Sequence, residues 1–184
     1  MKKVMIGKSS IRVSTAVIAG VLVNGKPNYS TLGSFGGMSM DPPVIYISVN
    51  KSHYSNAGIK ENGYFSVNIP SKNLVKETDY VGIVSGRDTD KSEVFKAFYG
   101  SIDKAPMIEE CPVNILCKLI NTLDLTRNEV FIGEIVETYV DREYIVDDKP
   151  DVRKINPLLL AGGKYCELGN PVGTTREAGK ELIG

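Results

Sequence analysis

Apolar and polar positions alternate along much of the chain, and this pattern of period two predicts β-strands. In residues 44–49, for example, aliphatic side chains alternate with Tyr46 and Ser48. Turn-forming pairs such as Asn24-Gly25 separate the strand patterns. The predicted strands are residues 13–23, 44–49, 65–69, 113–123, 129–140 and 143–146. Because they follow one another in hairpin-like order, we expect a largely antiparallel sheet.

Helical patterns are shorter and lie between the strands. They predict helices over residues 52–62, 73–85 and 91–99, the first of which ends at Asn62-Gly63, a left-handed stop. Residues 28–41 are polar and rich in glycine, so we expect a loop there. The fold class that follows is mainly β with helical insertions, a small antiparallel β-barrel rather than a βαβ fold. We expect one domain over residues 1–184.

Composition and charge exclude several classes of protein. The 184 residues include 22 Lys+Arg and 22 Asp+Glu, so the formal net charge is +0. This balance argues against a protein that binds nucleic acid through its phosphates. The longest apolar stretch, residues 16–23, is too short to cross a bilayer, and no signal-peptide pattern follows the basic start. The three cysteines form no CxxC pair, so we expect reduced thiols in a cytoplasmic protein that binds neither nucleic acid nor membrane.

The single histidine, His53, limits the chemistry that side chains can perform. A His-rich metal centre is excluded, and thiolate zinc would need clustered cysteines, so we predict no metal site. A Ser-His or Cys-His mechanism would have to use His53 as its base; otherwise a cofactor must bring the chemistry. The chain has no Rossmann, P-loop or nucleophile-elbow motif.

Two segments have the composition of an anion site. Small and hydroxyl residues in 28–39 would let backbone N–H groups approach an anion, although an ordinary surface loop has the same composition. Residues 50–55 join a strand to a helix start, where free N–H groups and the helix dipole favour a phosphate. Lys51 and His53 would add charge there. The alternative is that Ser52 is only an N-cap and Lys51 only a solvated charge.

A third segment, residues 85–91, is a charged turn. Its Arg87 has two interpretations. The guanidinium could bind a phosphate or carboxylate, or it could pair with Asp88 or Asp90 at the surface.

Taken together and in order, four blocks of residues carry a resemblance to a known family. They are Asn28-x-x-Thr31 running through Gly36 to Asp41-Pro42-Pro43; Tyr46-Ile47-Ser48-Val49 with His53-Tyr54-Ser55 and Gly63-Tyr64-Phe65-Ser66-Val67-Asn68-Ile69-Pro70; Asp79-Tyr80-x-Gly82 with Ser85-Gly86-Arg87 and Asp90-Lys91; and Glu110-Cys111-Pro112 with Phe131-Ile132-Gly133-Glu134. The chain resembles the flavin reductase-like family of FMN-binding split barrels, in its flavoredoxin branch.

The resemblance implies a six-stranded antiparallel split β-barrel that forms a homodimer and holds FMN near the subunit interface. By position, residues 31–34 would line the flavin ring and ribityl chain, residues 51–55 would hold the phosphate, and residues 85–87 would close over the flavin. The implied cofactor-binding residues are Asn28, Thr31, Leu32, Gly33, Ser34, Ser48, Asn50, Lys51, Ser52, His53, Tyr54, Ser55, Ser85, Gly86, Arg87 and Lys91. Many relatives carry Arg where this chain has Asn50, so Lys51 and His53 would supply the missing charge.

The function implied by the resemblance is that of a flavin reductase or flavoredoxin. Electrons would pass from NADH, NADPH or a protein donor through FMN to free flavin, ferric iron or a redox protein partner. Hydride transfer to a flavin depends on positioning more than on a side-chain base, so we predict no catalytic side chain and a phosphate-binding role for His53. The alternative is a flavin-binding module without turnover, acting as a sensor or a store.

Overall fold

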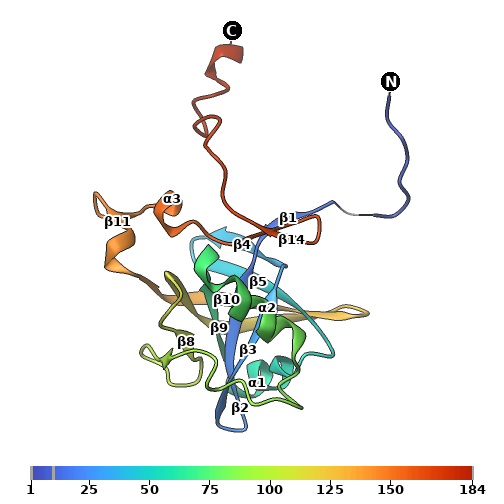
Figure 1. Cartoon of the computed structure of the whole chain (residues 1–184), viewed down its shortest axis with the longest axis vertical. Coiled ribbons are helices and arrows are strands. Elements are labelled where there is room, and N and C mark those ends of the chain that lie inside the picture. Colours follow the sequence, from blue (N-terminus) through green and yellow to red (C-terminus); the bar gives the residue numbers. More distant parts are fainter. Residues whose placement is uncertain (1, 10, 184) are drawn as a thin grey trace.

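A 7-stranded antiparallel sheet forms the body of the computed structural model, which describes residues 2–9 and 11–183 (Figure 1). Its order is β3-β2-β6-β9-β10-β5-β4. The strands are β2 (Val17–Val23), β3 (Lys26–Leu32), β4 (Phe35–Met40), β5 (Pro43–Asn50), β6 (Tyr64–Ile69), β9 (Val113–Asp124) and β10 (Asn128–Val140). Each neighbouring pair is antiparallel, and the sheet curls so that β3 comes near β5. The predicted antiparallel, mainly β fold is confirmed.

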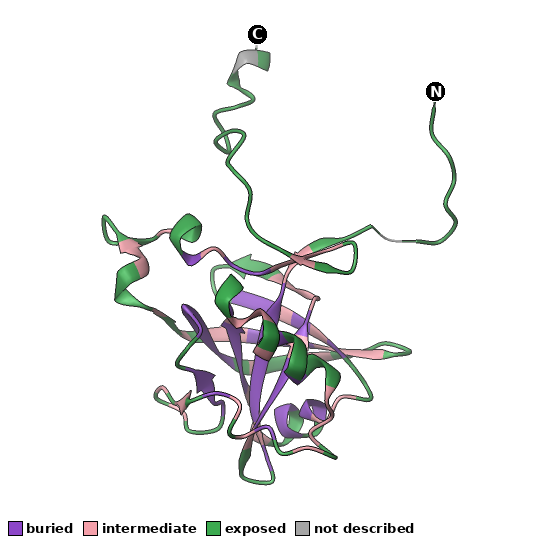
Figure 2. Cartoon of the chain, in the orientation of Figure 1, coloured by how far each residue is buried: buried purple, intermediate pink, exposed green. Residues whose placement is uncertain are grey.

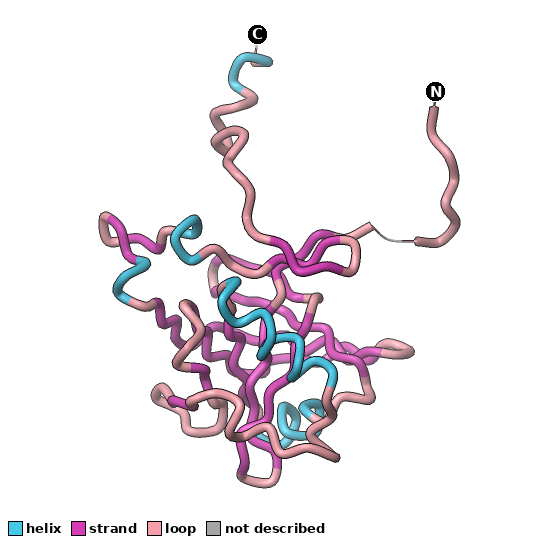
Figure 3. The backbone as a smooth tube through the Cα atoms, in the orientation of Figure 1, coloured by secondary structure: helices cyan, strands magenta, loops and turns pink. Residues whose placement is uncertain are grey.

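Short elements surround this sheet (Figure 3). A 3-stranded sheet consists of β1 (Val13–Thr15), β13 (Leu159–Ala161) and β14 (Lys164–Cys166). Two further pairs are β7 (Ala97–Phe98) with β8 (Met107–Ile108), and β11 (Ile145–Val146) with β12 (Lys149–Pro150). The helices are α1 (Ser55–Asn62), α2 (Val75–Ile83) and α3 (Val152–Ile155), with 3₁₀ turns at Lys72–Leu74, Arg142–Tyr144 and Lys180–Leu182.

The core lies inside the curl of the sheet, where Figure 2 shows buried residues along the central strands. Ile47, Phe65 and Phe131 are fully buried there, one each from β5, β6 and β10. The lack of a side chain at Gly133 lets the Phe65 ring pack across β10, because a Cβ at Gly133 would lie 2.6 Å from Phe65 Cζ. Burial of these aliphatic and aromatic side chains is the main force that holds the strands together.

Helix α1 lies directly against β2, and this contact positions the first residues of the helix. A Cβ at Gly58 would collide with the carbonyl oxygen of Leu22. At its other end α1 stops at Gly63, whose φ is 68° and whose N–H donates to the Ile59 carbonyl. The left-handed stop predicted at Asn62-Gly63 is therefore confirmed.

Residues 28–41, predicted as a loop, are instead mostly strand, and the sheet has seven strands where six were expected. The prediction was wrong because the polar residues of β3 are buried. Asn28 and Ser30 are 5% and 3% exposed, and their side chains hydrogen-bond to Ser55 of α1. The strand prediction depended on buried positions being apolar and exposed positions polar. Buried polar side chains that have hydrogen-bond partners break this alternation.

Two helix predictions also need correction. Helix α1 begins at Ser55 rather than Ser52, since Ser52 is held in a turn by Asn50. Residues 91–99 do not form a helix but a series of turns that ends in β7. There the Lys91 ammonium is buried against the end of α2, and the Phe95 ring packs edge-on against Tyr29 at 5.3 Å, so tertiary contacts override the helical pattern.

The two terminal segments extend away from the body on the same side (Figure 1). Residues 2–9 are exposed, as are residues 167–180. Within the described ranges, no helix has the length and apolar character needed to span a bilayer.

Candidate functional site

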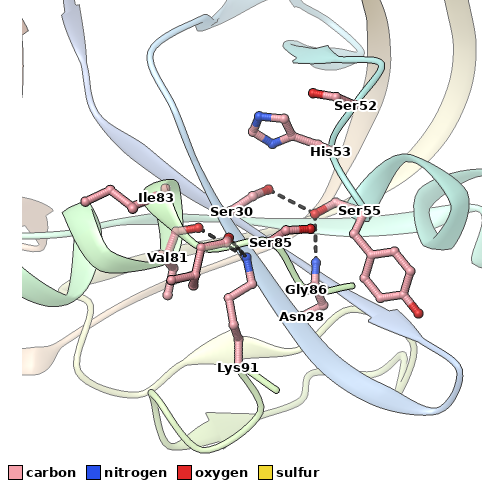
Figure 4. A pocket seen from close by; sticks show the side chains of 13 residues that line it. Asn28, Ser30, Ser52, His53, Ser55, Val81, Ile83, Ser85, Gly86 and Lys91 are labelled. Carbon is pink, nitrogen blue, oxygen red and sulfur yellow. Dashed lines mark hydrogen bonds between the residues drawn. The ribbon is translucent and has the colours of Figure 1, made fainter. Parts of the chain in front are cut away.

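A cavity of about 230 Å³, which we call the first cavity, lies between β3, the start of α1, the end of α2 and the segment that follows α2 (Figure 4). Its lining is largely polar. The lining residues are Asn28, Ser30, Ser52, His53, Tyr54, Ser55, Val81, Gly82, Ile83, Val84, Ser85, Gly86 and Lys91. Nine of the sixteen predicted cofactor-binding residues therefore lie together: Asn28, Ser52, His53, Tyr54, Ser55, Ser85, Gly86 and Lys91 line the first cavity, and Arg87 covers it as described below.

Buried hydroxyl groups form one side of the first cavity. Asn28 Nδ2 donates to Ser55 Oγ at 2.9 Å, and the hydroxyls of Ser30 and Ser55 lie 3.0 Å apart. Only one of these two hydroxyls can donate to the other. Whichever way that bond runs, the second hydroxyl keeps its hydrogen, so one buried donor remains for a ligand.

Lys91 places a buried ammonium group at the same cavity. Its side chain is nearly inaccessible, with the residue 4% exposed, and Nζ donates to the carbonyls of Val81 at 3.2 Å and Val84 at 3.1 Å. These carbonyls belong to the end of α2, where a cation is favoured. Burial lowers the pKa of Lys91 from 10.5 to about 8. Since an ammonium has three N–H donors, one is left over for a ligand.

His53 and Lys91 lie on opposite sides of the hydroxyl pair formed by Ser30 and Ser55 (Figure 4). Its pKa is lowered by burial, and further by the positive charges of Lys91 and Arg87. Among the described residues that line the first cavity there is no Asp or Glu. The cavity is therefore electropositive, and an anion bound in it would relieve the mutual repulsion of its cations.

The start of α1 adds the positive end of a helix dipole. Tyr54 and Ser55 both line the cavity, and in the described chain no side chain caps the helix. The alternative interpretation of Ser52 as only an N-cap is therefore wrong. Its N–H and its hydroxyl both donate to Asn50 Oδ1 at 2.9 Å, so Asn50 shapes the turn that presents His53.

Arg87 crosses from the segment after α2 to the loop before α1. Its Nη1 donates to the Ser52 carbonyl, and the guanidinium lies 5.5 Å from the centre of the Tyr54 ring. The alternative interpretation, an ion pair of Arg87 with Asp88 or Asp90, is wrong because Arg87 bonds to the Ser52 carbonyl instead. Asp90 instead pairs with Lys26 at 2.7 Å. The segment 85–87 thus covers one side of the cavity. Closure of this segment over a flavin stays a prediction.

Lys51 does not line the first cavity. Its ammonium pairs with Asp124 at the end of β9, and its backbone N–H donates to the Arg127 carbonyl at 2.9 Å. The side chain thus connects the loop before α1 to the β9–β10 hairpin. A phosphate contact by Lys51 stays a prediction, and the geometry favours His53 and Lys91 over it.

The remaining predicted residues lie further along β3 and β5. Thr31 donates to the Thr78 carbonyl of α2, and Leu32 is buried in the core. Ser48 accepts a hydrogen bond from Asn128 at 3.0 Å. Gly33 and Ser34 line another cavity, of about 490 Å³, beside the paired strands β1 and β13, which we call the third cavity.

Strand β3 joins the first cavity to the third. Its residues Asn28 and Ser30 line the first cavity, and the chain continues from its end at Leu32 directly to Gly33 and Ser34 in the third. Because β3 is the last strand of the sheet, its outer edge is not paired with another strand of that sheet. The arrangement suits an elongated ligand with an anionic group at one end.

Sequence reasoning missed Ser30 and the end of α2 as parts of the site. It also missed Arg12, whose guanidinium donates to Ser34 Oγ at 3.4 Å across the third cavity. Ser30 carried a usable signal, since it lies in the hydroxyl-rich segment 28–39 and inside the block that begins at Asn28. Residues 81–84 carried no such signal in the sequence, because only the fold brings the carbonyls of Val81 and Val84 to Lys91.

A family model described as "Flavin reductase like domain" matches residues 10–169. The chain belongs to this family. The segments that carry the first cavity all lie within the matched residues, from Asn28 of β3 to Lys91. The resemblance identified from the four blocks is thus confirmed.

Solved structures similar to this flavin reductase-like chain include two flavoredoxins. The flavoredoxin from Methanosarcina acetivorans is 40% identical with a TM-score of 0.96, and the match covers 99% of this chain and 100% of that one. The flavoredoxin of Desulfovibrio vulgaris (Miyazaki F) is 31% identical with a TM-score of 0.89, covering 97% and 100%. A putative flavin reductase with a split barrel domain from Shewanella frigidimarina has a TM-score of 0.78 at 23% identity over 88% of this chain and 85% of that one, which identifies the fold as a split barrel.

Proposed function

We propose that this chain is a flavin-dependent oxidoreductase that binds FMN, with the phosphate in the first cavity. The observation that carries this proposal is the convergence of Lys91, His53 and the Ser30–Ser55 hydroxyl pair in a cavity without a described carboxylate. The match to the flavin reductase-like family and the similarity to two flavoredoxins support it.

The donors of the first cavity fit a phosphate dianion. Lys91 has one N–H free of its two carbonyl partners, and the serine pair has one free hydroxyl hydrogen. His53 adds a ring nitrogen, and the start of α1 adds backbone N–H groups. Charge-assisted hydrogen bonds of this kind are about twice as strong as neutral ones, so the anion compensates for the buried charge.

The ring and ribityl chain are proposed to follow β3 from the first cavity toward Gly33 and Ser34. Bound FMN would supply the hydride- and electron-transfer chemistry. The residues of this chain bind and orient: Arg87 holds the cover over the site by its bond to the Ser52 carbonyl, and Arg12 reaches Ser34 beside the third cavity. No side-chain acid or base is assigned.

The reaction proposed is electron transfer from NADH, NADPH or a protein donor through FMN to an acceptor such as free flavin, ferric iron or a redox protein. The protein is proposed to work as a homodimer. A reducing compartment such as the cytoplasm is part of the proposal, since Cys111, Cys117 and Cys166 are free thiols.

Binding of FMN and riboflavin, followed by fluorescence, tests the phosphate site. Because riboflavin lacks the phosphate, we expect it to bind about 10- to 100-fold more weakly than FMN. His53→Ala is expected to weaken FMN and leave riboflavin unchanged. Lys51→Ala is the matched control: its ammonium is already paired with Asp124, so FMN affinity should stay within about threefold. Equal affinities of the wild-type protein for both flavins would contradict the assignment.

Turnover separates the two functions that share this site. The FMN-loaded protein is mixed with NADH or NADPH and with free flavin or ferric iron, and oxidation of the nicotinamide is followed by its absorbance. An electron-transfer protein oxidises the nicotinamide or accepts electrons from a reduced protein donor. A protein that retains FMN and accepts electrons from neither source would be the non-catalytic module.

A further inference from the structure

Glu129 of β10 contacts the helix that opens at the first cavity. Its side chain is 14% exposed and bonds to two residues of α1. Asn56 Nδ2 donates to Oε2 at 2.8 Å, and Lys60 Nζ donates to Oε1 at 2.8 Å. Asn56 and Lys60 are one helical turn apart and therefore lie on the same face of α1. One carboxylate thus holds this face of the helix against β10.

The Asn56 side chain connects this carboxylate to the turn before α1. Its amide nitrogen also donates to the Asn50 carbonyl oxygen at 3.3 Å, and the His53 N–H donates to the same oxygen at 2.9 Å. Because a carbonyl and a carboxylate can only accept, both must face the amide nitrogen. Asn56 Oδ1 is then left buried without a donor among the described residues. The orientation of the side chain is fixed by the two acceptors that it joins.

These contacts are buried, whereas a second link between the turn and the sheet lies at the surface. Asn56 is 4% exposed. The side chains of the Lys51–Asp124 ion pair, which ties the turn to the β9–β10 hairpin, are 40% and 74% exposed. An exposed ion pair contributes little to stability, but a buried group that loses its hydrogen bond finds no water to replace it. Loss of the Glu129–Asn56 bond should therefore change the turn more than loss of the Lys51 pair.

Two groups that line the first cavity depend on this arrangement. His53 ends the turn, and Ser55 lies in the first turn of α1. The Ser55 hydroxyl lies 3.0 Å from that of Ser30, so a shift of α1 changes the geometry of the hydroxyl pair. Glu129 itself does not line the cavity, and both of its oxygens accept from α1. Its negative charge is compensated by Lys60 and does not face a bound anion.

We propose that Glu129 is a positioning residue of the first cavity, which holds His53 and Ser55 in place through the Asn56 amide. The inference rests on the proposed function, since it concerns residues that would bind the phosphate there. It adds a residue from β10, a strand none of whose described residues lines the first cavity. Because the carboxylate does not reach the cavity, it acts only through the two groups that it positions.

The single histidine makes this positioning measurable without a flavin. In the ligand-free protein, the His53 ring protons are followed by NMR as the pH is varied. Burial lowers the pKa of His53, as do the charges of Lys91 and Arg87, which both variants keep. In Glu129→Ala and in Asn56→Ala the turn loosens and the ring gains access to water, so the pKa of His53 should shift upward. Removal of the Glu129 charge would by itself lower that pKa, so an upward shift reports a change in position.

Affinities for FMN and riboflavin show what the positioning does for the phosphate. Glu129→Ala should bind FMN about tenfold more weakly than the wild-type protein, whereas riboflavin, which lacks the phosphate, should bind within about threefold of wild type. Glu129→Gln keeps an oxygen that can accept from Asn56, so it should keep the FMN affinity within about threefold and the His53 titration of the wild-type protein. Lys60→Ala is the matched control. It removes the other partner of the same carboxylate, at a half-exposed side chain, and should match the wild-type protein in both measurements.

The outcomes separate a positioning role from a structural one. If Glu129→Ala unfolds more readily in urea but keeps the wild-type His53 titration and FMN affinity, the carboxylate only stabilises the fold and the proposal is overturned. Equal losses in Lys60→Ala and Glu129→Ala would assign the effect to the ion pair and overturn it too. Asn56→Ala tests the same contact if Glu129→Ala does not fold. A wild-type protein that binds FMN no more tightly than riboflavin would overturn the proposed phosphate site, while the His53 titration would still decide whether Glu129 positions the turn.

Discussion

Lys91 is the residue whose environment says most about the site. Its ammonium is buried without a carboxylate partner in the described chain, and its two hydrogen bonds go to neutral carbonyl groups. A buried charge of this kind is costly unless it is paired. The cost is reflected in its pKa of about 8, and a bound phosphate would offset it.

The affinity for FMN should therefore fall as the pH rises past 8. Below pH 8 Lys91 is protonated in the free protein, and above it the proton must be taken up again for the phosphate to bind. We expect an approximately tenfold loss of affinity between pH 7 and pH 9. The FMN phosphate, with a second pKa near 6, stays a dianion over this range, and His53, whose pKa is lowered, stays neutral.

Two substitutions isolate the contribution of Lys91. Lys91→Gln should bind FMN more weakly at pH 7 and show no pH dependence from 7 to 9. Lys91→Arg keeps the charge across that range, so its affinity should also be independent of pH but higher than that of Lys91→Gln. A titration series at fixed ionic strength measures all three proteins. A flat wild-type curve would contradict a role for the ammonium.

Single residues of the site were predictable where a local sequence pattern marked them. They were not predictable where contacts with distant parts of the chain determine the direction of the side chain. His53 and Ser55 follow a strand and open a helix, a pattern visible in the sequence, and both line the first cavity. Lys51 belongs to the same pattern, yet its ammonium turns to Asp124, which only the β9–β10 hairpin brings near. At position 50 this chain has Asn where many relatives have Arg. The Asn50 side chain accepts hydrogen bonds from the N–H and hydroxyl of Ser52 and so shapes the turn before α1.

At the level of elements, the strands with uninterrupted alternation were predicted best. Strands β9 and β10 were expected to within a few residues, because their buried faces are apolar. Strand β3 was missed for the opposite reason: Asn28 and Ser30 are polar and buried together against Ser55. The elements that build the site depart from the ordinary pattern because burying polar groups is part of forming a ligand site.

The contact between α1 and β2 gives an element-level prediction about stability. Replacing glycine by alanine inside a helix ordinarily stabilises a protein by up to about 1 kcal/mol. At Gly58 the added methyl group would meet the Leu22 carbonyl, so Gly58→Ala should instead destabilise by about 1–3 kcal/mol. FMN affinity should fall with it, since a displaced α1 moves Ser55.

Urea unfolding followed by circular dichroism measures this effect. Gly37→Ala is the control, because Gly37 lies in β4 and a methyl group added there would meet no heavy atom within 4 Å. That variant should unfold at the wild-type urea concentration or slightly above it, because alanine lowers the entropy of the unfolded chain. Stabilisation by Gly58→Ala would show that α1 can move away from β2 without cost.

For the whole molecule, the exposed apolar side chains gather in the terminal segments and on the sheet edge β4. Val4, Met5 and Ile11 near one end, Val172 and Leu182 near the other, are more than four-fifths exposed, as is Met40 of β4 at 94%. Both segments project on one side of the body (Figure 1). Large exposed apolar side chains on extended segments are candidates for burial against a partner, and we propose a second copy of the chain as that partner.

Light scattering coupled to gel filtration tests this assembly. The expected mass is twice the 20.1 kDa of one chain. A variant that lacks residues 170–184 should dimerise more weakly while its body unfolds at the wild-type temperature, because residues 170–180 are exposed and none of them belongs to the core of the sheet. A wild-type mass of one chain at micromolar concentration would refute the dimer.

The three cysteines differ sharply in how far a reagent can reach them. Cys111 and Cys117 are 0% exposed, and burial raises the pKa of both thiols, that of Cys117 to about 12. Cys166 is exposed at the end of β14, where the C-terminal segment leaves the body. The natural sequence therefore carries its own attachment point for a maleimide dye or a spin label. A probe placed there, without any mutation, would report how the C-terminal segment moves relative to the barrel.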